Sequence, residues 1–135
     1  MRVYFAGSIR GGRDDSAIYM KLIEKASRYG EVLTEHVGSV GEEDLADADI
    51  FARDLEWLRT ADAVVAEVTT PSLGVGYEIG TAQAWGIPTL CLFRHGSSRR
   101  LSAILSGNPE LQVTEYSALD EAMDAIGIFL ASVRP

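Results

Sequence analysis

The stretch from Ala63 to Val68, with the sequence AVVAEV, is the feature that most limits what this chain can fold into. Apolar residues occupy both alternating sets of positions along it, so a strand formed here would be buried on both of its faces. Such strands are typical of parallel sheets that helices cover on each side. Shorter apolar runs rich in strand-forming residues recur at 3–6, 32–33 and 89–93 and, more weakly, at 111–113.

Helical periodicity characterises the segments between these runs. Apolar residues in the segment 18–29 recur at spacings of three and four, which predicts a helix opened by Asp14 or Asp15 and closed by Gly30. Further helices are expected at about 47–61, 75–85 and 119–133, with a short one that opens at Ser102.

Alternating strands and helices over 135 residues predict a single α/β domain that spans 1–135. The expected architecture is an open, parallel, five-stranded sheet with helices on both faces, of the flavodoxin-like or Rossmann-like kind. Ligands of such sheets bind beyond the carboxyl ends of the strands. The loops that follow the predicted strands are therefore the expected places for a site, at 7–13, 37–47, 69–74 and 94–100.

Charge and composition narrow the classes of partner. The chain has 12 Lys and Arg against 20 Asp and Glu, a formal net charge of -8, which disfavours a nucleic-acid polymer because such partners require a basic surface. A small phosphorylated ligand remains compatible with this charge, provided that local donors surround it. The chain has one cysteine, Cys91, inside an apolar run, where we expect a buried thiol. We expect no signal peptide, no membrane segment and a cytoplasmic protein.

The segment Gly7 to Arg13, GSIRGGR, follows the first predicted strand and precedes a helix. It offers backbone N–H groups, one hydroxyl and two guanidinium groups, which together suit an anion. It matches neither G-x-G-x-x-G nor the phosphate loop that ends in Gly-Lys-Ser/Thr, so dinucleotides and nucleoside triphosphates lose support. An anion site and an ordinary glycine turn with solvated arginines both remain open.

Asp54 lies in the middle of the apolar stripe of the helix predicted over 47–61. At 100° per residue, this stripe contains Ile50, Phe51, Trp57, Leu58 and Ala61. A carboxylate in that position needs a partner, because an unsatisfied buried charge costs several kcal/mol. Two interpretations are open: a structural carboxylate bonded to the backbone of a neighbouring loop, or an acid at the wall of a ligand site.

The segment PSLGVGYEIG, from Pro71 to Gly80, joins the run AVVAEV to the next predicted helix. Gly74 and Gly76 would allow a tight turn close to a ligand, and Ser72 offers a hydroxyl. Glu78 is expected in the first helical turn, where the helix macrodipole favours its ionised form and hence a nucleophile or base. An ordinary glutamate at a helix start is the equally open alternative.

Glu78 and Asp54 could together face one ligand. Two carboxylates are the groups that cleave acetal-like bonds through an oxocarbenium-like transition state, and an N-glycosidic bond to a nucleobase is such a bond. With an anion loop nearby, a nucleoside monophosphate is a natural substrate. Three other side chains have two interpretations each. Tyr4 is either a core residue or a phenol at the sheet edge, and His36 is either part of a base pocket or an exposed residue at a strand end. Ser102 either contacts a ligand or caps a helix.

Five segments of the chain resemble a known family. VYFAGSIRGGR, EVLTEHV, ARDLEWLRTADAVVAEVT, PSLGVGYEIG and LCLFR resemble the 2′-deoxynucleoside 5′-phosphate N-hydrolases, the Rcl-type branch of the nucleoside 2-deoxyribosyltransferase superfamily. The resemblance spans residues 3 to about 106. It implies hydrolysis of a deoxynucleoside monophosphate to free base and 2-deoxyribose 5-phosphate by a homodimer, without metal or cofactor.

The resemblance also implies roles for individual residues. Glu78 would be the nucleophile, Asp54 would assist departure or protonation of the base, and Tyr4 would orient Glu78 or the sugar. The positions implied to hold the 5′-phosphate are Ser8, Arg10, Gly12 and Ser72, with Ser102 supplied by the partner subunit. The positions implied to border the base or sugar are Ile9, His36, Ile50 and Gly74.

The predicted function is therefore a purine-tolerant N-glycosidase that acts on deoxyribonucleoside 5′-monophosphates. Three other functions remain open. They are a ribonucleotide hydrolase acting on CMP or a modified pyrimidine nucleotide, a true deoxyribosyltransferase, and a nucleotide sensor without catalysis. The loop at 37–47 is acidic and shorter than expected for the vertebrate members, so it leaves the preferred base undetermined.

Overall fold

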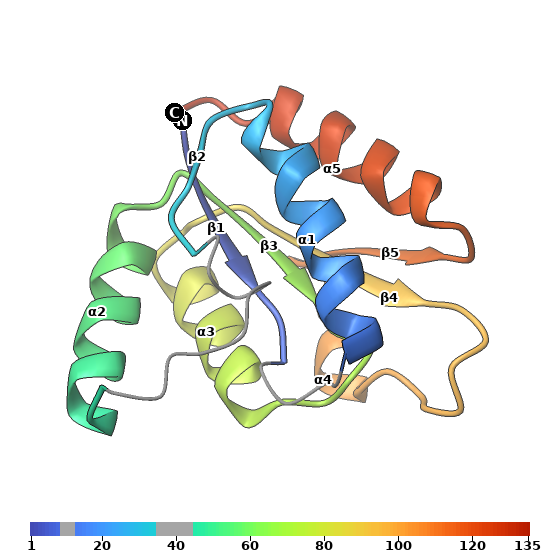
Figure 1. Ribbon diagram of the computed structural model, residues 1–135, viewed down its shortest axis with the longest axis horizontal. Helices are drawn as coiled ribbons and strands as arrows, with labels where there is room; N and C mark the ends of the chain where they lie inside the picture. The colour runs from blue at the N-terminus through green and yellow to red at the C-terminus, as the bar shows by residue number, and fades with distance from the viewer. Residues whose placement is uncertain (9–12, 35–44) are drawn as a thin grey trace.

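The computed structural model describes residues 1–8, 13–34 and 45–135, with strands and helices alternating along the chain (Figure 1). The strands of these described residues are β1 (Arg2–Ala6), β2 (Glu31–Val32), β3 (Ala63–Glu67), β4 (Thr89–Arg94) and β5 (Gln112–Tyr116). The helices are α1 (Arg13–Ser27), α2 (Asp47–Thr60), α3 (Leu73–Ala84), α4 (Ala103–Ser106) and α5 (Leu119–Ser132).

The strands pair in parallel in the order β2-β1-β3-β4-β5. This is the flavodoxin-like order, so the predicted fold class is confirmed. The chain builds outward from β1 to β2 and then crosses back to β3 on the other side of β1, where Tyr4 lies opposite Val64. The strand order therefore reverses between β1 and β3, and the carboxyl ends of these two strands are the expected ligand position.

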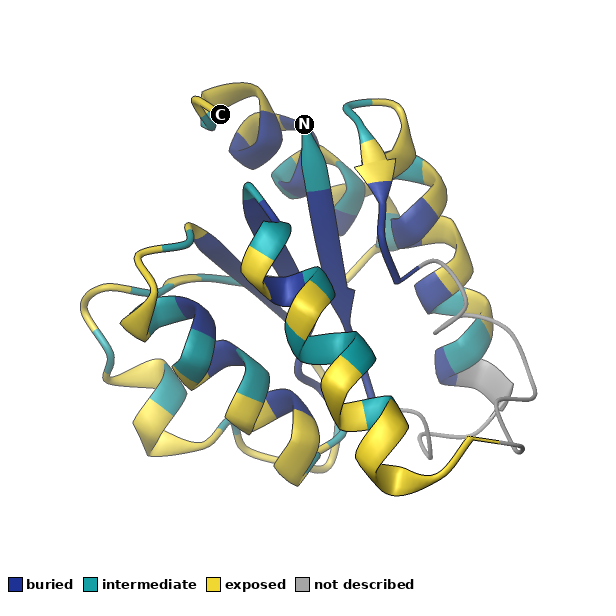
Figure 2. Ribbon diagram, turned by 90° about the vertical axis from the view of Figure 1, so that its left-hand side faces the viewer, coloured by how far each residue is buried: buried dark blue, intermediate teal, exposed yellow. Residues whose placement is uncertain are grey.

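Helices cover both faces of the sheet, and β1 contributes to both cores. Phe5 faces the core formed with α1 and α5, whereas its neighbour Tyr4 faces the core formed with α2 and α3. The two-residue alternation of a strand produces this division. Figure 2 shows the resulting pattern, with strands largely buried and helices exposed along their outer sides. None of the described helices has the length and apolar composition that crossing a membrane requires.

The run AVVAEV forms β3 and the residue after it, as predicted. All five residues of β3 are buried, including the charged Glu67. The helices of both layers therefore cover this strand, which explains why both of its alternating residue sets are apolar.

Both ends of α1 differ from the prediction. The helix begins at Arg13, so Asp14 and Asp15 lie inside it and neither is its N-cap. It ends at Ser27, and Gly30 follows with a backbone outside the left-handed region. Glycine is required there because a Cβ at Gly30 would lie 2.2 Å from the carbonyl oxygen of Met1. The constraint is thus a close backbone approach rather than a left-handed helix cap.

The last strand was predicted too early and too short. Its pairing with β4 runs from Gln112 to Tyr116, beyond the weak apolar run at 111–113. The strand lies at the edge of the sheet and carries polar residues at several positions, so its apolar signal is weak. Tyr116 at its end is buried.

Candidate active site

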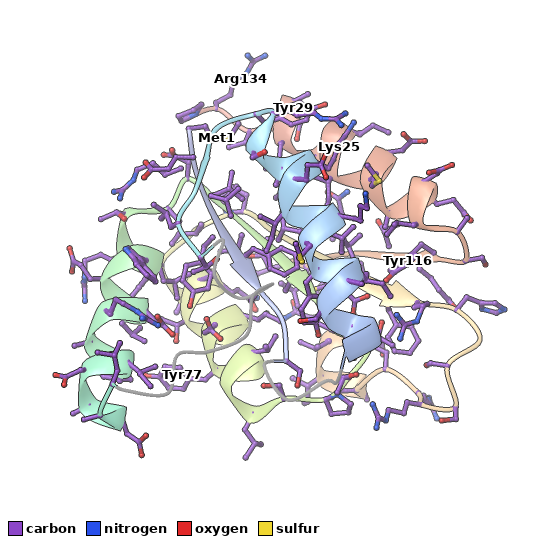
Figure 3. The ribbon with its side chains drawn as sticks, in the orientation of Figure 1. Met1, Lys25, Tyr29, Tyr77, Tyr116 and Arg134 are labelled. Carbon is purple, nitrogen blue, oxygen red and sulfur yellow. The ribbon has the colours of Figure 1, made fainter. Side chains whose placement is uncertain are left out.

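The site lies at the switch point between β1 and β3, where three elements bring polar side chains together. Tyr4 comes from β1, Asp54 from α2 and Glu78 from α3. Figure 3 shows Tyr77, the neighbour of Glu78, on the side of α3 that faces α2. Its ring lies 6.3 Å from that of Phe51, so an aromatic pair links the two helices beside the carboxylates. The three residues predicted as catalytic therefore occupy one region.

Tyr4 donates a hydrogen bond from its hydroxyl to Oε2 of Glu78. The side chain belongs to the core on the α2 and α3 face and is only 1% exposed, so both interpretations of Tyr4 hold at once. Burial, followed by the charge of Glu78, raises the pKa of the Tyr4 phenol far above its usual range. Tyr4 is therefore a neutral donor that fixes the position of the Glu78 carboxyl group.

Glu78 has a pKa raised to about 7, and burial is the largest cause. The hydrogen bond from Tyr4 lowers this pKa, while the charge of Asp54 raises it. The prediction that the helix start keeps Glu78 ionised is wrong. Ser72 is the N-cap and α3 begins at Leu73, so Glu78 lies in the second turn, beyond the reach of the macrodipole. Both protonation states of Glu78 are accessible near neutral pH.

Asp54 has the partner that its position on α2 requires. Nε and Nη2 of Arg53 each lie 3.0 Å from Oδ1 of Asp54. Among the described residues, the partner is thus the neighbouring side chain of Arg53. The apolar stripe around Asp54 is less complete than predicted, because Leu58 is buried whereas Phe51 is exposed and Ile50 is half-buried.

The predicted anion loop is described at its first residues only. Gly7 and Ser8 are buried, and the backbone N–H of Ser8 donates to the hydroxyl of Tyr19 at 3.0 Å. A Cβ at Gly7 would lie 2.8 Å from the Tyr19 ring, so only glycine allows this approach. The other predicted contacts, Ile9, Arg10, Gly12 and His36, lie outside the described residues.

A buried polar network beneath the site escaped the sequence analysis. Glu67 accepts hydrogen bonds from the backbone N–H of Thr69 at 2.7 Å, from its hydroxyl at 3.0 Å, and from the hydroxyl of Tyr116, which Figure 3 labels. Burial raises the pKa of Tyr116, so this residue also remains a neutral donor. The one charged residue in AVVAEV was the signal that could have predicted this network.

Asp15 connects this network to α1. Its Oδ2 accepts from the Thr70 hydroxyl at 2.7 Å, and its Oδ1 lies 3.2 Å from Nη2 of Arg94. The carboxylate therefore ties the start of α1 to the loop after β3 and to the end of β4. This contact explains why Asp15 is not a helix cap: its side chain points to the loop that carries Ser72.

Ser72 and Ser102 of the same chain line one cavity of about 410 Å³. Each is also an N-cap: the Ser72 hydroxyl accepts from Val75 N–H at 3.3 Å, and the Ser102 hydroxyl accepts from Ile104 N–H at 3.3 Å. The predicted capping role of Ser102 is therefore confirmed. Gly74 is exposed in the first turn of α3 and has ordinary helical backbone geometry, so no strained turn requires glycine there.

A sequence comparison identifies the family. The profile described as nucleoside 2-deoxyribosyltransferase matches residues 3–123. The chain belongs to this family. The mouse protein named 5-hydroxymethyl-dUMP N-hydrolase is 55% identical over 124 residues, which cover 85% of this chain and 72% of that protein. The human protein of the same name is 51% identical over 123 residues, covering 84% of this chain and 71% of that protein.

Solved structures agree on the fold of this family member. The Clostridium botulinum CMP N-glycosidase BcmB matches with a TM-score of 0.71 at 18% identity, covering 96% of this chain and 99% of that chain. The 2-deoxyribosyltransferase of Bacillus psychrosaccharolyticus matches with a TM-score of 0.68 at 13% identity, covering 100% and 98%. At these identities the likeness establishes the shared fold. Among the residues described here, no group of three or more His, Cys, Asp or Glu is arranged to hold a metal ion.

The two neighbours of Glu78 should shift its pKa in opposite directions. Tyr4→Phe removes a donor to the carboxylate, so the pKa of Glu78 should rise above about 7, whereas Asp54→Asn removes a nearby negative charge and should lower it. Titration of the Glu78 side-chain carboxyl by ¹³C NMR measures both shifts. Tyr29→Phe is the control, because Figure 3 shows Tyr29 near Met1 and away from Tyr77, the neighbour of Glu78. Shifts in the same direction, or a Glu78 that titrates near 4.5, would contradict this electrostatic account.

Proposed function

We propose that this protein hydrolyses the N-glycosidic bond of 2′-deoxyribonucleoside 5′-monophosphates and releases the free base and 2-deoxyribose 5-phosphate. The observation that carries the proposal is the Tyr4–Glu78 hydrogen bond with Asp54 close enough to affect the Glu78 pKa. It gives one carboxyl group a fixed orientation and places a second beside it. The names of the mouse and human relatives support a deoxynucleoside monophosphate as substrate.

Glu78 is the nucleophile in this mechanism. Its ionised oxygen attacks the anomeric carbon, the bond from that carbon to the base nitrogen breaks, and the electron pair leaves with the base. Asp54 assists this departure, and the base takes up a proton from solvent. Tyr4 holds the attacking carboxylate in position and does not itself act as a nucleophile, because its phenol stays protonated.

Water completes the reaction by attacking the anomeric carbon of the glycosyl-Glu78 ester. The carbon–oxygen bond to Glu78 breaks, the Glu78 carboxylate is regenerated, and Asp54 accepts the proton that the water loses and returns it to solvent. The net change is addition of one water across the N-glycosidic bond, with no oxidant, metal or cofactor required.

Because Glu78 must be ionised to attack, kcat/KM should rise with pH through about 7.

Phosphate recognition belongs to the loops at the carboxyl ends of β1 and β3. Ser8 and Ser72 follow these two strands, and we assign Arg10 and Gly12 of the first loop to the same task. The network of Asp15 and Thr70 fixes the loop that carries Ser72. Binding energy from the phosphate can then orient the anomeric carbon toward Glu78. We assign Ile9, His36, Ile50 and Gly74 to the base and sugar.

A second copy of the chain completes the proposed enzyme. Leu73 on α3 is 98% exposed and Ile104 on α4 is 80% exposed, and Tyr77, Gly76 and Gly80 continue the exposed side of α3. An exposed apolar side of a helix is stabilised when another surface covers it, which supports a homodimer through this surface. In that dimer Ser102 would reach the phosphate in the partner's site.

The cytoplasmic location stays a prediction from the sequence.

Base release tests the proposed function directly. Wild-type protein is incubated with dGMP, dAMP, dCMP, dTMP, 5-hydroxymethyl-dUMP and CMP, and free base is followed by chromatography. We expect release from deoxynucleotides, and loss of about three orders of magnitude in kcat for Glu78→Gln and Glu78→Ala. Glu56→Gln, an exposed carboxylate on α2, is the matched control and should keep wild-type activity.

Each rival function gives a different result in this assay. A ribonucleotide hydrolase prefers CMP, a transferase forms a new nucleoside when a second base is supplied, and a sensor binds nucleotide without releasing base. Release of no base by folded wild-type protein would overturn the proposal. Wild-type turnover in Glu78→Gln would remove the nucleophile assignment.

Mixed dimers test whether Ser102 acts across the subunit boundary. Ser102→Ala alone should raise KM for monophosphates about tenfold, the cost of one hydrogen bond to a charged group. Mixing it with Glu78→Ala creates one site that has Glu78 from the first chain and Ser102 from the second, so the wild-type KM should return. If Ser102 acts within its own chain, the mixture keeps the raised KM. Ser106→Ala on α4 is the control.

A further inference from the structure

Arg53 is a cation in contact with Asp54, and the reaction described above gives it no role. It precedes Asp54 on α2, and its charge lowers the pKa of Tyr4, which bonds to Glu78. Arg53 is thus within electrostatic range of Tyr4 as well as in contact with Asp54. Its geometry toward Asp54 indicates what it does there.

Two nitrogens of the guanidinium converge on a single oxygen of Asp54. Nε and Nη2 both lie 3.0 Å from Oδ1, and no described residue donates a hydrogen bond to Oδ2. The side chains are 24% and 23% exposed, so solvent screens this pair less than a surface ion pair. One carboxylate oxygen is therefore held by Arg53, and among the described residues the other is open to a ligand.

Trp57 fixes the guanidinium in turn. The Cζ atom of Arg53 lies 4.7 Å from the centre of the Trp57 ring, one helical turn further along α2. Stacking of a planar guanidinium on an indole restricts its rotation, and a lysine ammonium could not reproduce both the stacking and the two hydrogen bonds. Trp57 orients Arg53, and Arg53 orients Asp54.

Arg59 on the same helix forms an exposed counterpart of this arrangement with Trp85, which lies at the end of α3. Arg59 lies 4.7 Å from the centre of the Trp85 ring, and its Nε lies 3.7 Å from Oε2 of Glu56. These two charged side chains are 63% and 68% exposed and lie outside the site. The comparison shows that stacking alone does not define the role, because only Arg53 holds a carboxylate of the site.

We propose that Arg53 is a positioning residue that binds Oδ1 of Asp54 and thereby presents Oδ2 to the departing base. The inference rests on the proposed function, because it assigns Arg53 a part in the step that Asp54 assists. Arg53 itself does not touch the reacting atoms. Its removal leaves the Asp54 carboxyl group in place but free to rotate, so the chemical step should slow while substrate binding is retained.

The experiment is a double-mutant cycle with steady-state kinetics. Arg53→Gln should lower kcat about ten- to hundredfold, as misplacement of a reacting group does, with KM changed less than about threefold. Arg53→Lys should restore part of kcat, since lysine keeps the positive charge but cannot donate two hydrogen bonds from a planar group. In an Asp54→Asn background, Arg53→Gln should have no further effect. Arg59→Gln should match the wild type, and thermal unfolding should confirm that every variant is folded.

Two results would overturn the inference. Wild-type kcat in folded Arg53→Gln would show that Asp54 needs no positioning. An undiminished effect of Arg53→Gln in the Asp54→Asn background would show that Arg53 acts on the substrate directly. Failure of the proposed function is a separate outcome, because the wild type in the same assay would then release no base.

Discussion

The hydrogen bond from Tyr4 to Glu78 connects β1 to the helix that carries the candidate nucleophile. It depends on the strand order: β1 pairs with β3, so the residues after both strands, and the helix that follows β3, meet at one point. It also depends on burial, which keeps the Tyr4 phenol protonated and raises the Glu78 pKa to about 7. The fold thus determines both the position and the charge state of the reactive carboxyl group.

Buried polar groups beneath the site extend this constraint to the loops. Glu67, the last residue of β3, accepts hydrogen bonds from Thr69 and Tyr116. Asp15 links α1 to the loop that leads to Ser72. No buried side-chain nitrogen or oxygen of the described residues lacks a partner. Fully satisfied networks of this kind hold loops in one arrangement, which is what a site for a small phosphorylated sugar requires.

The sequence predicted the sheet and its parallel strands, because AVVAEV and the helical periods are strong local signals. The roles of Tyr4, Asp54 and Glu78 were implied by the resemblance to a known family and stay predictions. It did not predict what depends on contacts between distant residues. The electrostatic state of Glu78 was predicted from a helix start that lies two residues earlier than expected, and burial decides it instead. Arg94, which contacts Asp15, and Tyr116, which donates to Glu67, lie far from these residues in sequence, so no local pattern identifies them as partners.

The central claim is that Glu78 attacks the sugar and forms a covalent intermediate. Methanolysis of a β-configured deoxynucleoside monophosphate tests it, because methanol can replace water in the second step and gives a methyl glycoside whose configuration is stable. Two displacements at one carbon retain the configuration, so ¹H NMR should show the β-methyl glycoside of 2-deoxyribose 5-phosphate. An α-methyl glycoside would mean that the solvent attacks the substrate directly, and it would contradict the nucleophilic role of Glu78.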